Sequence, residues 1–223
     1  MGTLEMAAKR VSHKADSQRL FGQPSAECNK RNKSQSLTHR QASDFRGLTL
    51  MVLDVGCGTR KAEPGAVGID VHPRSAADII WDLDELPWPL DSDAFDRVHM
   101  SHIIEHVQNV TRTMVEIWRV ARDGADVFVV TPHFSSHNSY TDPTHVRHLA
   151  ARSFHYFTGE DFATFSGSNV RFSIEGLELT FGKNFVLDGT GGWLARHNLE
   201  WYERHAAWVF PAQDIRCHLR VRK

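Results

Sequence analysis

Leu53-Asp54-Val55-Gly56-Cys57-Gly58-Thr59-Arg60 is the stretch that decides the fold of this chain. It continues an apolar run at residues 48–53, which predicts a buried strand. The strand ends in an acidic residue and a glycine turn. Since glycine has no Cβ, Gly56 and Gly58 can adopt positive φ and let the backbone approach a ligand closely. The glycines alone are equally compatible with an ordinary turn, so the interpretation depends on the segments around them.

A second strand-like run, Ala66-Val67-Gly68-Ile69, ends in Asp70. In a parallel nucleotide-binding sheet, an acid at the tip of the second strand binds the ribose hydroxyls. The two segments together predict a nucleoside held by the backbone of Gly56–Gly58 and by the Asp70 carboxylate. The connection at residues 61–65 is short, so we expect a first helix of at most about two turns.

The other elements are predicted from hydrophobic periodicity and from glycine positions. Strands are expected at residues 78–81, 94–100, 125–131, 170–181 (with a kink at Gly176) and 215–221. Helices are expected at residues 103–121, 153–165 and 193–208, the first of them ended by Arg122-Asp123-Gly124. A polar loop that carries four histidines spans residues 132–153, and loops of this length are usually functional or disordered.

Four motifs, taken in order, resemble those of class I S-adenosylmethionine-dependent methyltransferases, in particular the broad type 11 group. They are LDVGCGTR, GIDVHP, the run at residues 82–89, and FDRVHMSHIIEHV, and the resemblance covers roughly residues 48–165. It implies an α/β fold, a Rossmann-like doubly wound seven-stranded sheet, mostly parallel with an antiparallel C-terminal strand. Arg60 stands where many relatives have a third glycine, and this departure concerns the methionine end of the cofactor.

The resemblance also implies S-adenosylmethionine as the cofactor and a set of residues that hold it. Asp82 matches the position that faces the adenine base, with Leu83 offering an apolar side chain; Asp82 can equally be a cap at the end of a strand. Ser101 and His102 close the site at the end of the fourth strand. The expected cofactor-binding residues are Asp54, Gly56, Cys57, Gly58, Asp70, Asp82, Leu83, Ser101 and His102.

Methyl transfer from a sulfonium depends mainly on positioning, and a poorly acidic hydroxyl acceptor also needs a general base. The topology places three histidines where they can face the methyl group: His106, His133 and His145. Each of them can also be a hydrogen-bonding residue of a helix start or loop. Arg147 can bind a carboxylate or phosphate of the acceptor, or pair with Asp142.

Residues 102–106 also match H-x-x-E-H, the inverted zinc-peptidase motif. Its place directly after the fourth strand is the one that the methyltransferase pattern expects, which argues against a peptidase. Small-RNA 2′-O-methyltransferases of similar architecture hold a divalent metal at this position. Glu105, His106 and His145 can do the same, although His102 stands where that family has another carboxylate. Our prediction assigns no metal.

Composition sets broad limits on the protein. Its 223 residues predict one domain with a sizeable core, and its net charge of −1 gives no global basic field for nucleic acid. Three scattered cysteines argue against a disulfide framework and for a reducing compartment. There is no apolar run of about 20 residues and no apolar core of a secretory signal. We therefore expect a cytoplasmic protein without a membrane segment.

Residues 1–46 differ in composition from the rest, with nine basic and four acidic residues. They predict a disordered basic N-terminal tail, with the methyltransferase domain at residues 47–223. An arm that touches an anionic partner and an amphipathic helix at residues 4–11 are the alternatives.

The acceptor is expected to be a hydroxyl or amine of a small-molecule or sugar-like compound. The loop sequence DPTHVRHL resembles methyltransferases found with polysaccharide and secondary-metabolite pathways. Two other functions stay open: a metal-dependent RNA ribose methyltransferase, and a non-catalytic binding module that kept the fold.

Overall fold

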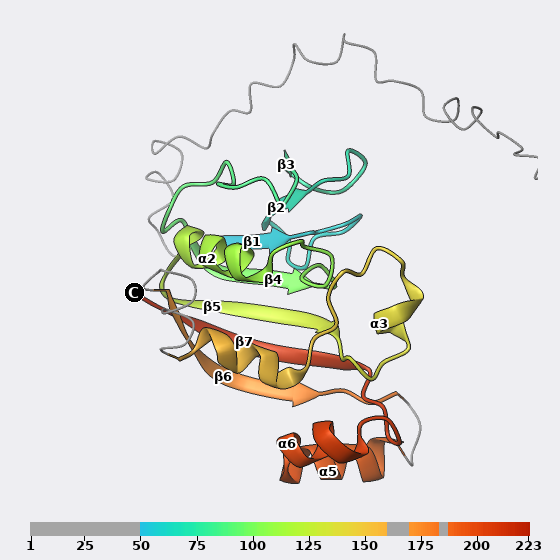
Figure 1. Cartoon of the computed structure of the whole chain (residues 1–223). Coiled ribbons are helices and arrows are strands. Elements are labelled where there is room, and N and C mark those ends of the chain that lie inside the picture. The colour runs from blue at the N-terminus through green and yellow to red at the C-terminus, as the bar shows by residue number, and fades with distance from the viewer. Residues whose placement is uncertain (1–49, 160–169, 183–186) are drawn as a thin grey trace, which may run out of the picture. The chain divides into compact units, whose positions relative to one another are not determined.

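The computed structural model describes residues 50–159, 170–182 and 187–223. Within these segments, seven strands form one sheet in the order β3-β2-β1-β4-β5-β7-β6 (Figure 1). Strands β1 to β5 pair in parallel, and β7 runs antiparallel to both β5 and β6. The predicted Rossmann-like sheet with an antiparallel last strand is confirmed. Its strands are β1 (Val52–Val55), β2 (Val67–Asp70), β3 (Ile79–Ile80), β4 (Phe95–Ser101), β5 (Ala121–Pro132), β6 (Arg171–Leu179) and β7 (Asp214–Arg222).

The helical segments are short, and α2 and η1 lie on the same face of the sheet in Figure 1. Among the residues that the structure describes, no helix has the length and apolar character needed to cross a membrane. The α-helices are α2 (Val110–Val120), α3 (Asn138–Thr141), α5 (Gly192–His197) and α6 (Leu199–Trp201). The other helical turns are the 3₁₀ helix η1 (Ala151–Phe157) and the π-helical η2 (Leu187–Gly191) and η3 (Tyr202–Ala206).

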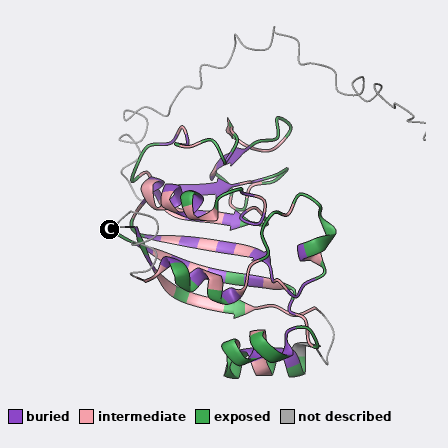
Figure 2. Ribbon diagram, in the orientation of Figure 1, coloured by how far each residue is buried: buried purple, intermediate pink, exposed green. Residues whose placement is uncertain are grey.

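The sheet has one apolar face and one more polar face. All of β1 is buried, and buried and half-buried residues alternate along much of β5 (Figure 2). Val127 and Val129 belong to the main core, and the side chain between them points to the opposite face because strand residues alternate. There Phe128 stacks between His99 and His218, with ring centroids 5.4 and 4.4 Å away.

The predicted helix at residues 103–121 is wrong at its start. The helix α2 begins at Val110, and the Asn109 side chain caps it by accepting the Arg112 N–H at 3.0 Å. The carbonyl of Glu105 accepts the N–H groups of residues 146 and 147 at 2.9 and 3.1 Å, bonds made across to the loop after β5. Apolar residues at 103, 104 and 107 therefore line a turn, although their spacing is also that of a helix.

The predicted end of this helix is also too late. Helix α2 ends at Val120, and Ala121 already has extended backbone and pairs with Phe95 of β4. The residues expected to stop the helix thus form the start of β5, where Gly124 has a φ of +76°.

The remaining expected elements have different outcomes. No helix stands between β1 and β2, where residues 56–66 form turns. The kink expected at Gly176 is confirmed as a shift in the pairing of β6 with β7 between Ile174 and Gly176. The expected helix at residues 193–208 is interrupted at Asn198, whose backbone is extended. The predicted tail at residues 1–46 lies outside the described residues, as does the end of the helix expected at residues 153–165.

Candidate functional site

The glycine turn after β1 contains two positions that favour glycine. Gly56 has a φ of +67° and Gly58 of +56°. The Gly56 N–H donates to the Ile69 carbonyl at 2.8 Å, and the Gly58 N–H donates to the Asp70 carboxylate at 2.9 Å. A Cβ on Gly56 would lie 2.4 Å from Cγ1 of Ile103, so space as well as φ demands glycine there. The turn is thus tied to the tip of β2 and packed against the segment that follows β4.

Asp54 and Cys57 contact this turn with their side chains. The Asp54 carboxylate is almost fully buried and accepts the Ala62 N–H at 2.6 Å. Burial raises the pKa of Asp54, and the Ala62 hydrogen bond opposes that rise. Cys57 is buried, and its Sγ lies 2.8 Å from the place that a Cβ on Gly68 would take. Both side chains therefore shape the connection between β1 and β2.

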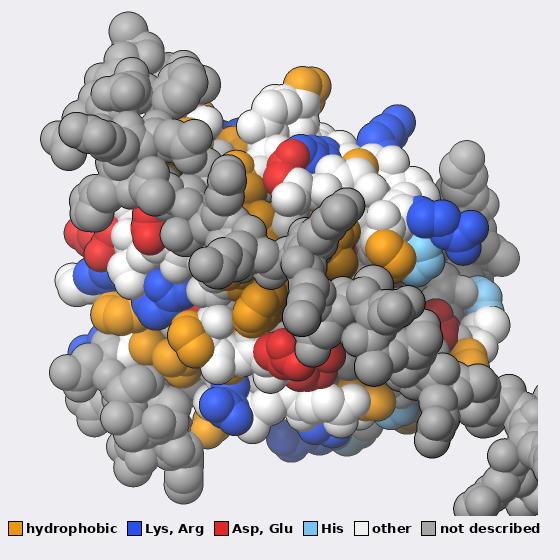
Figure 3. All heavy atoms as spheres, turned by 90° about the horizontal axis from the view of Figure 1, so that it is seen from above, with side chains coloured by type: hydrophobic (Ala, Val, Ile, Leu, Met, Phe, Trp, Pro, Cys, Tyr) orange, Lys and Arg blue, Asp and Glu red, His pale blue; other side chains and the backbone are white. Residues whose placement is uncertain are grey.

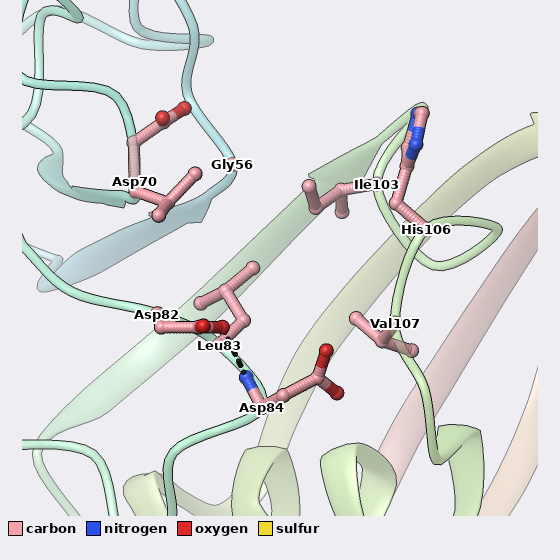
Figure 4. Close-up of a pocket in the computed structure, with 9 residues that line it drawn as sticks. Gly56, Asp70, Asp82, Leu83, Asp84, Ile103, His106 and Val107 are labelled. Carbon is pink, nitrogen blue, oxygen red and sulfur yellow. Dashed lines mark hydrogen bonds between the residues drawn. The ribbon is translucent and has the colours of Figure 1, made fainter. Parts of the chain in front are cut away.

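A pocket of about 140 Å³ opens beside the turn. Gly56 and Asp70 lie at one end of it, Asp82 to Asp84 along one side, and Ile103 to Val107 along the other (Figure 4). Its lining combines apolar side chains with three carboxylates, and no lysine or arginine is among the described residues that line it. The lining residues are Gly56, Asp70, Val71, Asp82, Leu83, Asp84, Ile103, His106 and Val107.

The wall that carries Leu83 is anchored by a buried tryptophan. Trp88 is 2% exposed and donates from Nε1 to the Leu83 carbonyl at 3.1 Å. Its backbone N–H donates at 2.7 Å to Glu116, a buried residue of α2. The two walls are joined directly, since the Gln108 N–H donates to the Asp84 carboxylate at 2.8 Å. The pocket shape therefore depends on α2 as well as on the loop after β3.

Ser101 ends strand β4 and His102 follows it, and neither residue lines this pocket. Ser101 is exposed, and His102 has a φ of +53°, a conformation that a residue with a Cβ rarely adopts. His102 Nδ1 lies 3.4 Å from Glu105 Oε1. The neighbouring Glu105 carboxylate raises the pKa of His102, against the opposing effect of burial.

A second pocket, about 600 Å³ in volume, adjoins the first because His106 lines both. His102, Glu105 and His145 also line it, together with residues of the loop after β5. Seen from above, the histidine side chains visible on this face lie on the side toward which most strand arrows of Figure 1 point (Figure 3). That side is the carboxyl edge of the parallel strands, where ligands bind in open α/β sheets.

The structure brings His106 and His145 together, with ring centroids 4.6 Å apart. Nδ1 of His145 lies 3.2 Å from the Ser139 carbonyl, which can only accept a hydrogen bond. Nδ1 of His106 lies 3.0 Å from the Thr144 hydroxyl, whose own hydrogen goes to the Asp142 carboxylate at 2.7 Å. When the two rings are neutral, this network assigns the proton of each to Nδ1. The Nε2 atom of each ring then carries no proton and has a lone pair available.

His133 lies apart from this pair. It is fully buried, its Nδ1 accepts the Ser135 N–H at 3.2 Å, and its Nε2 lies 3.3 Å from Glu203. Its surroundings match the alternative of a loop-anchoring histidine better than that of a residue facing an acceptor.

Arg147 also lies away from these two pockets. Its guanidinium donates to the backbone carbonyls of Val146 and Gln108, and it lines a separate pocket beside η1. The pairing with Asp142 that the sequence allowed is not the one formed, because Asp142 accepts from Thr144.

Sequence reasoning missed four residues that line the first pocket: Val71, Asp84, Ile103 and Val107. Val71 and Asp84 directly follow the predicted cofactor-binding residues Asp70 and Leu83, so their positions in the sequence could have identified them as pocket residues. Ile103 and Val107 are instead assigned to a helix by their spacing, and that assignment conceals their place in the turn after β4.

Comparison with known proteins identifies the family. The profile of a methyltransferase-domain family matches residues 18–165, more than half of the chain. Curated protein sequences gave no match. A chain of the complex between the Haloferax volcanii Trm112 methyltransferase activator and a methyltransferase is 15% identical, with a TM-score of 0.51; the match covers 82% of this chain and 88% of that chain. An S-adenosylmethionine-dependent methyltransferase from Archaeoglobus fulgidus is 17% identical, with a TM-score of 0.48, covering 81% and 90%.

At these identities the likeness to solved structures concerns the fold alone. The family profile, in contrast, matches the amino-acid sequence. It spans the glycine turn, the acid at the tip of β2 and the segment after β4, all of which meet at the carboxyl edge of the sheet. The chain belongs to the class I S-adenosylmethionine-dependent methyltransferases.

Proposed function

We propose that this methyltransferase holds S-adenosylmethionine in the pocket between Asp70, the loop after β3 and the turn after β4. The observation that carries the proposal is the position of the Asp70 carboxylate at the pocket end. Each of its oxygens accepts one backbone N–H, from Gly58 at 2.9 Å and from His72 at 2.7 Å. A carboxylate oxygen has two lone pairs, so both can still accept a ribose hydroxyl.

The remaining lining fits the rest of the cofactor. Leu83, Ile103 and Val107 offer an apolar slot for the adenine base, and Asp82 can accept from its exocyclic amine. Three carboxylates without a lysine or arginine among the described lining residues favour a cationic ligand, as the sulfonium is. At about 140 Å³ the pocket is smaller than typical ligand sites, so it fits the adenosine part.

The other predicted residues take less direct roles in this proposal. Asp54 and Cys57 hold the turn that presents Gly56 and Gly58, through the contacts of Ala62 and Gly68. Ser101 ends β4, and His102, which follows it, lines the second pocket.

The second pocket is the proposed place of the acceptor, a hydroxyl or amine of a small-molecule or sugar-like compound. The cofactor supplies a methyl group whose bond to sulfur breaks as the acceptor's lone pair bonds to the carbon. The chain positions the acceptor and receives its proton. The unprotonated Nε2 atoms of His106 and His145 suit that task, since both residues line this pocket. Buried His133 and backbone-bound Arg147 have no part in this proposal.

A transfer assay tests the acceptor part. Labelled methyl groups from S-adenosylmethionine should pass to members of a panel of sugars, small alcohols and amines. His106→Gln should lower kcat by roughly 10²- to 10⁴-fold, the usual contribution of a general base. His155→Gln, at an exposed residue of η1, is the matched control and should keep full activity. Transfer to RNA but to no small acceptor would overturn the proposed acceptor class.

A further inference from the structure

The strongest unexplained group outside the cofactor pocket is the Glu105 carboxylate. Glu105 is 1% exposed, and its Oε2 accepts the Thr131 hydroxyl at 3.0 Å. Its Oε1 is buried and accepts no hydrogen bond among the described residues, and the nearest charged partner is His102, whose Nδ1 lies 3.4 Å away. A buried carboxylate oxygen that accepts no hydrogen bond is destabilising, so such an atom needs an explanation.

Two imidazoles, those of His106 and His145, lie near this carboxylate. The ligand atoms of Glu105, His106 and His145 all lie within 4.8 Å of one another. The His145 Nε2 is 4.0 Å from Glu105 Oε1, too far for a hydrogen bond. Two ligand atoms of a tetrahedral zinc ion lie about 3.4 Å apart. The separation of His145 Nε2 and Glu105 Oε1 is therefore only slightly larger than one shared ion would require.

The surroundings orient all three groups as metal ligands. The Ser139 carbonyl and the Thr144 hydroxyl hold Nδ1–H of the two histidines, so both Nε2 lone pairs face away from those partners. Thr131 likewise occupies the other oxygen of Glu105. Hydrogen bonds of this kind fix the tautomer and the ring direction of metal-binding histidines. The cluster therefore has both a donor set and the contacts that support it.

We propose that Glu105, His106 and His145 bind a divalent transition-metal ion at the floor of the acceptor pocket. Two imidazoles and one carboxylate suit zinc, cobalt, manganese or iron better than calcium or magnesium. Three protein ligands leave coordination positions open for a ligand that enters through the pocket.

The ion also specifies the acceptor, and this part rests on the proposed function. An ion held by these three residues would lower the pKa of an acceptor hydroxyl that binds it, so the hydroxyl would lose its proton to water in the open pocket and its oxygen could attack the methyl group. The acceptor is then a hydroxyl, and the lone pairs of His106 and His145 bind the ion in place of taking the proton directly.

Titration of the full chain with Co²⁺, after removal of metal by chelator and without S-adenosylmethionine, tests the site. We expect one equivalent bound, with visible absorption bands of cobalt held by nitrogen and oxygen ligands. Glu105→Gln and His145→Ala should each weaken this binding at least about 10-fold, the scale at which even supporting residues act. Thr144→Val tests the supporting contact to His106 and should weaken it about 10-fold as well.

His137→Ala is the matched control, because His137 lies on the same loop, is exposed and stands outside the cluster. It should leave the bound equivalent unchanged. Equal cobalt binding by wild type and folded His145→Ala, or no binding by wild type, would overturn the proposal. Titration of the same samples with S-adenosylmethionine separates the two proposals. Cofactor binding without metal binding defeats only the metal site, and metal binding without cofactor binding defeats only the proposed cofactor pocket.

Discussion

At the scale of single residues, Gly56 is constrained twice, by a φ of +67° and by the side chain of Ile103 that packs against it. Gly56 and Asp70 could be singled out in the sequence because each has a local signal: a glycine in the turn after a strand, and an acid at the end of a strand. The close approach of Ile103 to Gly56 leaves none, since it joins residues far apart in the chain. The burial of His133 was likewise invisible in sequence, because its partner Glu203 lies 70 residues away.

Gly56→Ala is expected to destabilise the protein more than Gly124→Ala does. Both glycines have positive φ, so alanine at either costs roughly 1–2 kcal/mol of backbone strain. Only at Gly56 would the new Cβ overlap another side chain, which adds about 1–3 kcal/mol for overpacking. Urea unfolding measures both changes. Equal losses in the two variants would show that Ile103 moves away without cost.

Glu63 links the turn before β2 to strand β4 and gives a pH-dependent prediction. Hydrogen bonds from Arg97 and then His99 lower the pKa of Glu63. A carboxyl whose pKa is lower in the folded state stabilises it above the unfolded pKa, and that stabilisation is lost as pH falls through the folded pKa. Glu63→Gln should therefore cost about 0.5–1 kcal/mol near pH 6 and less near pH 3, which lies below the ordinary pKa of glutamate. Unfolding free energies at the two pH values test this. A difference from wild type that is the same at both would contradict it.

At the scale of elements, α2 supports the proposed cofactor pocket without lining it. Glu116 of α2 accepts the Trp88 N–H at 2.7 Å and pairs with Arg119 at 2.6 Å, while Trp88 holds the Leu83 carbonyl. The existence of α2 was predictable from its apolar spacing, but its start at Val110 was not. The same apolar residues fit a helix or a buried turn, and only the bonds from the loop after β5 to Glu105 decide between them.

Glu116→Ala should loosen the loop after β3 and weaken cofactor binding. It leaves the buried N–H of Trp88 without an acceptor, which costs about 1–3 kcal/mol of stability. Calorimetric titration should show weaker S-adenosylmethionine binding, although Glu116 does not line the pocket. Glu116→Gln keeps an acceptor oxygen and is the matched control, with a smaller loss in both measurements. Unchanged cofactor affinity in Glu116→Ala would separate α2 from the pocket.

At the scale of the whole molecule, the order of the motifs predicted the sheet. The glycine turn, the acid of β2 and the segment after β4 follow one another in sequence and meet at one edge in space. It was harder to predict which strand residues pack on each face of the sheet. Half-buried residues of β4, β5 and β7, such as His99, Phe128 and His218, pack on one another across strands, and such pairing depends on register.

Thermal unfolding with and without S-adenosylmethionine, in wild type and in Asp70→Asn, tests the central claim most directly. Cofactor at about 100 times its Kd should stabilise wild type by about 2.7 kcal/mol. For a domain of this size that raises Tm by roughly 5–10 °C. Asp91→Asn makes the same chemical change at an exposed site outside the pocket lining and should keep the full shift. The account predicts that Asp70→Asn, compared with its own cofactor-free Tm, loses most of the shift. A full shift in Asp70→Asn, or none in wild type at millimolar cofactor, would contradict the proposed pocket.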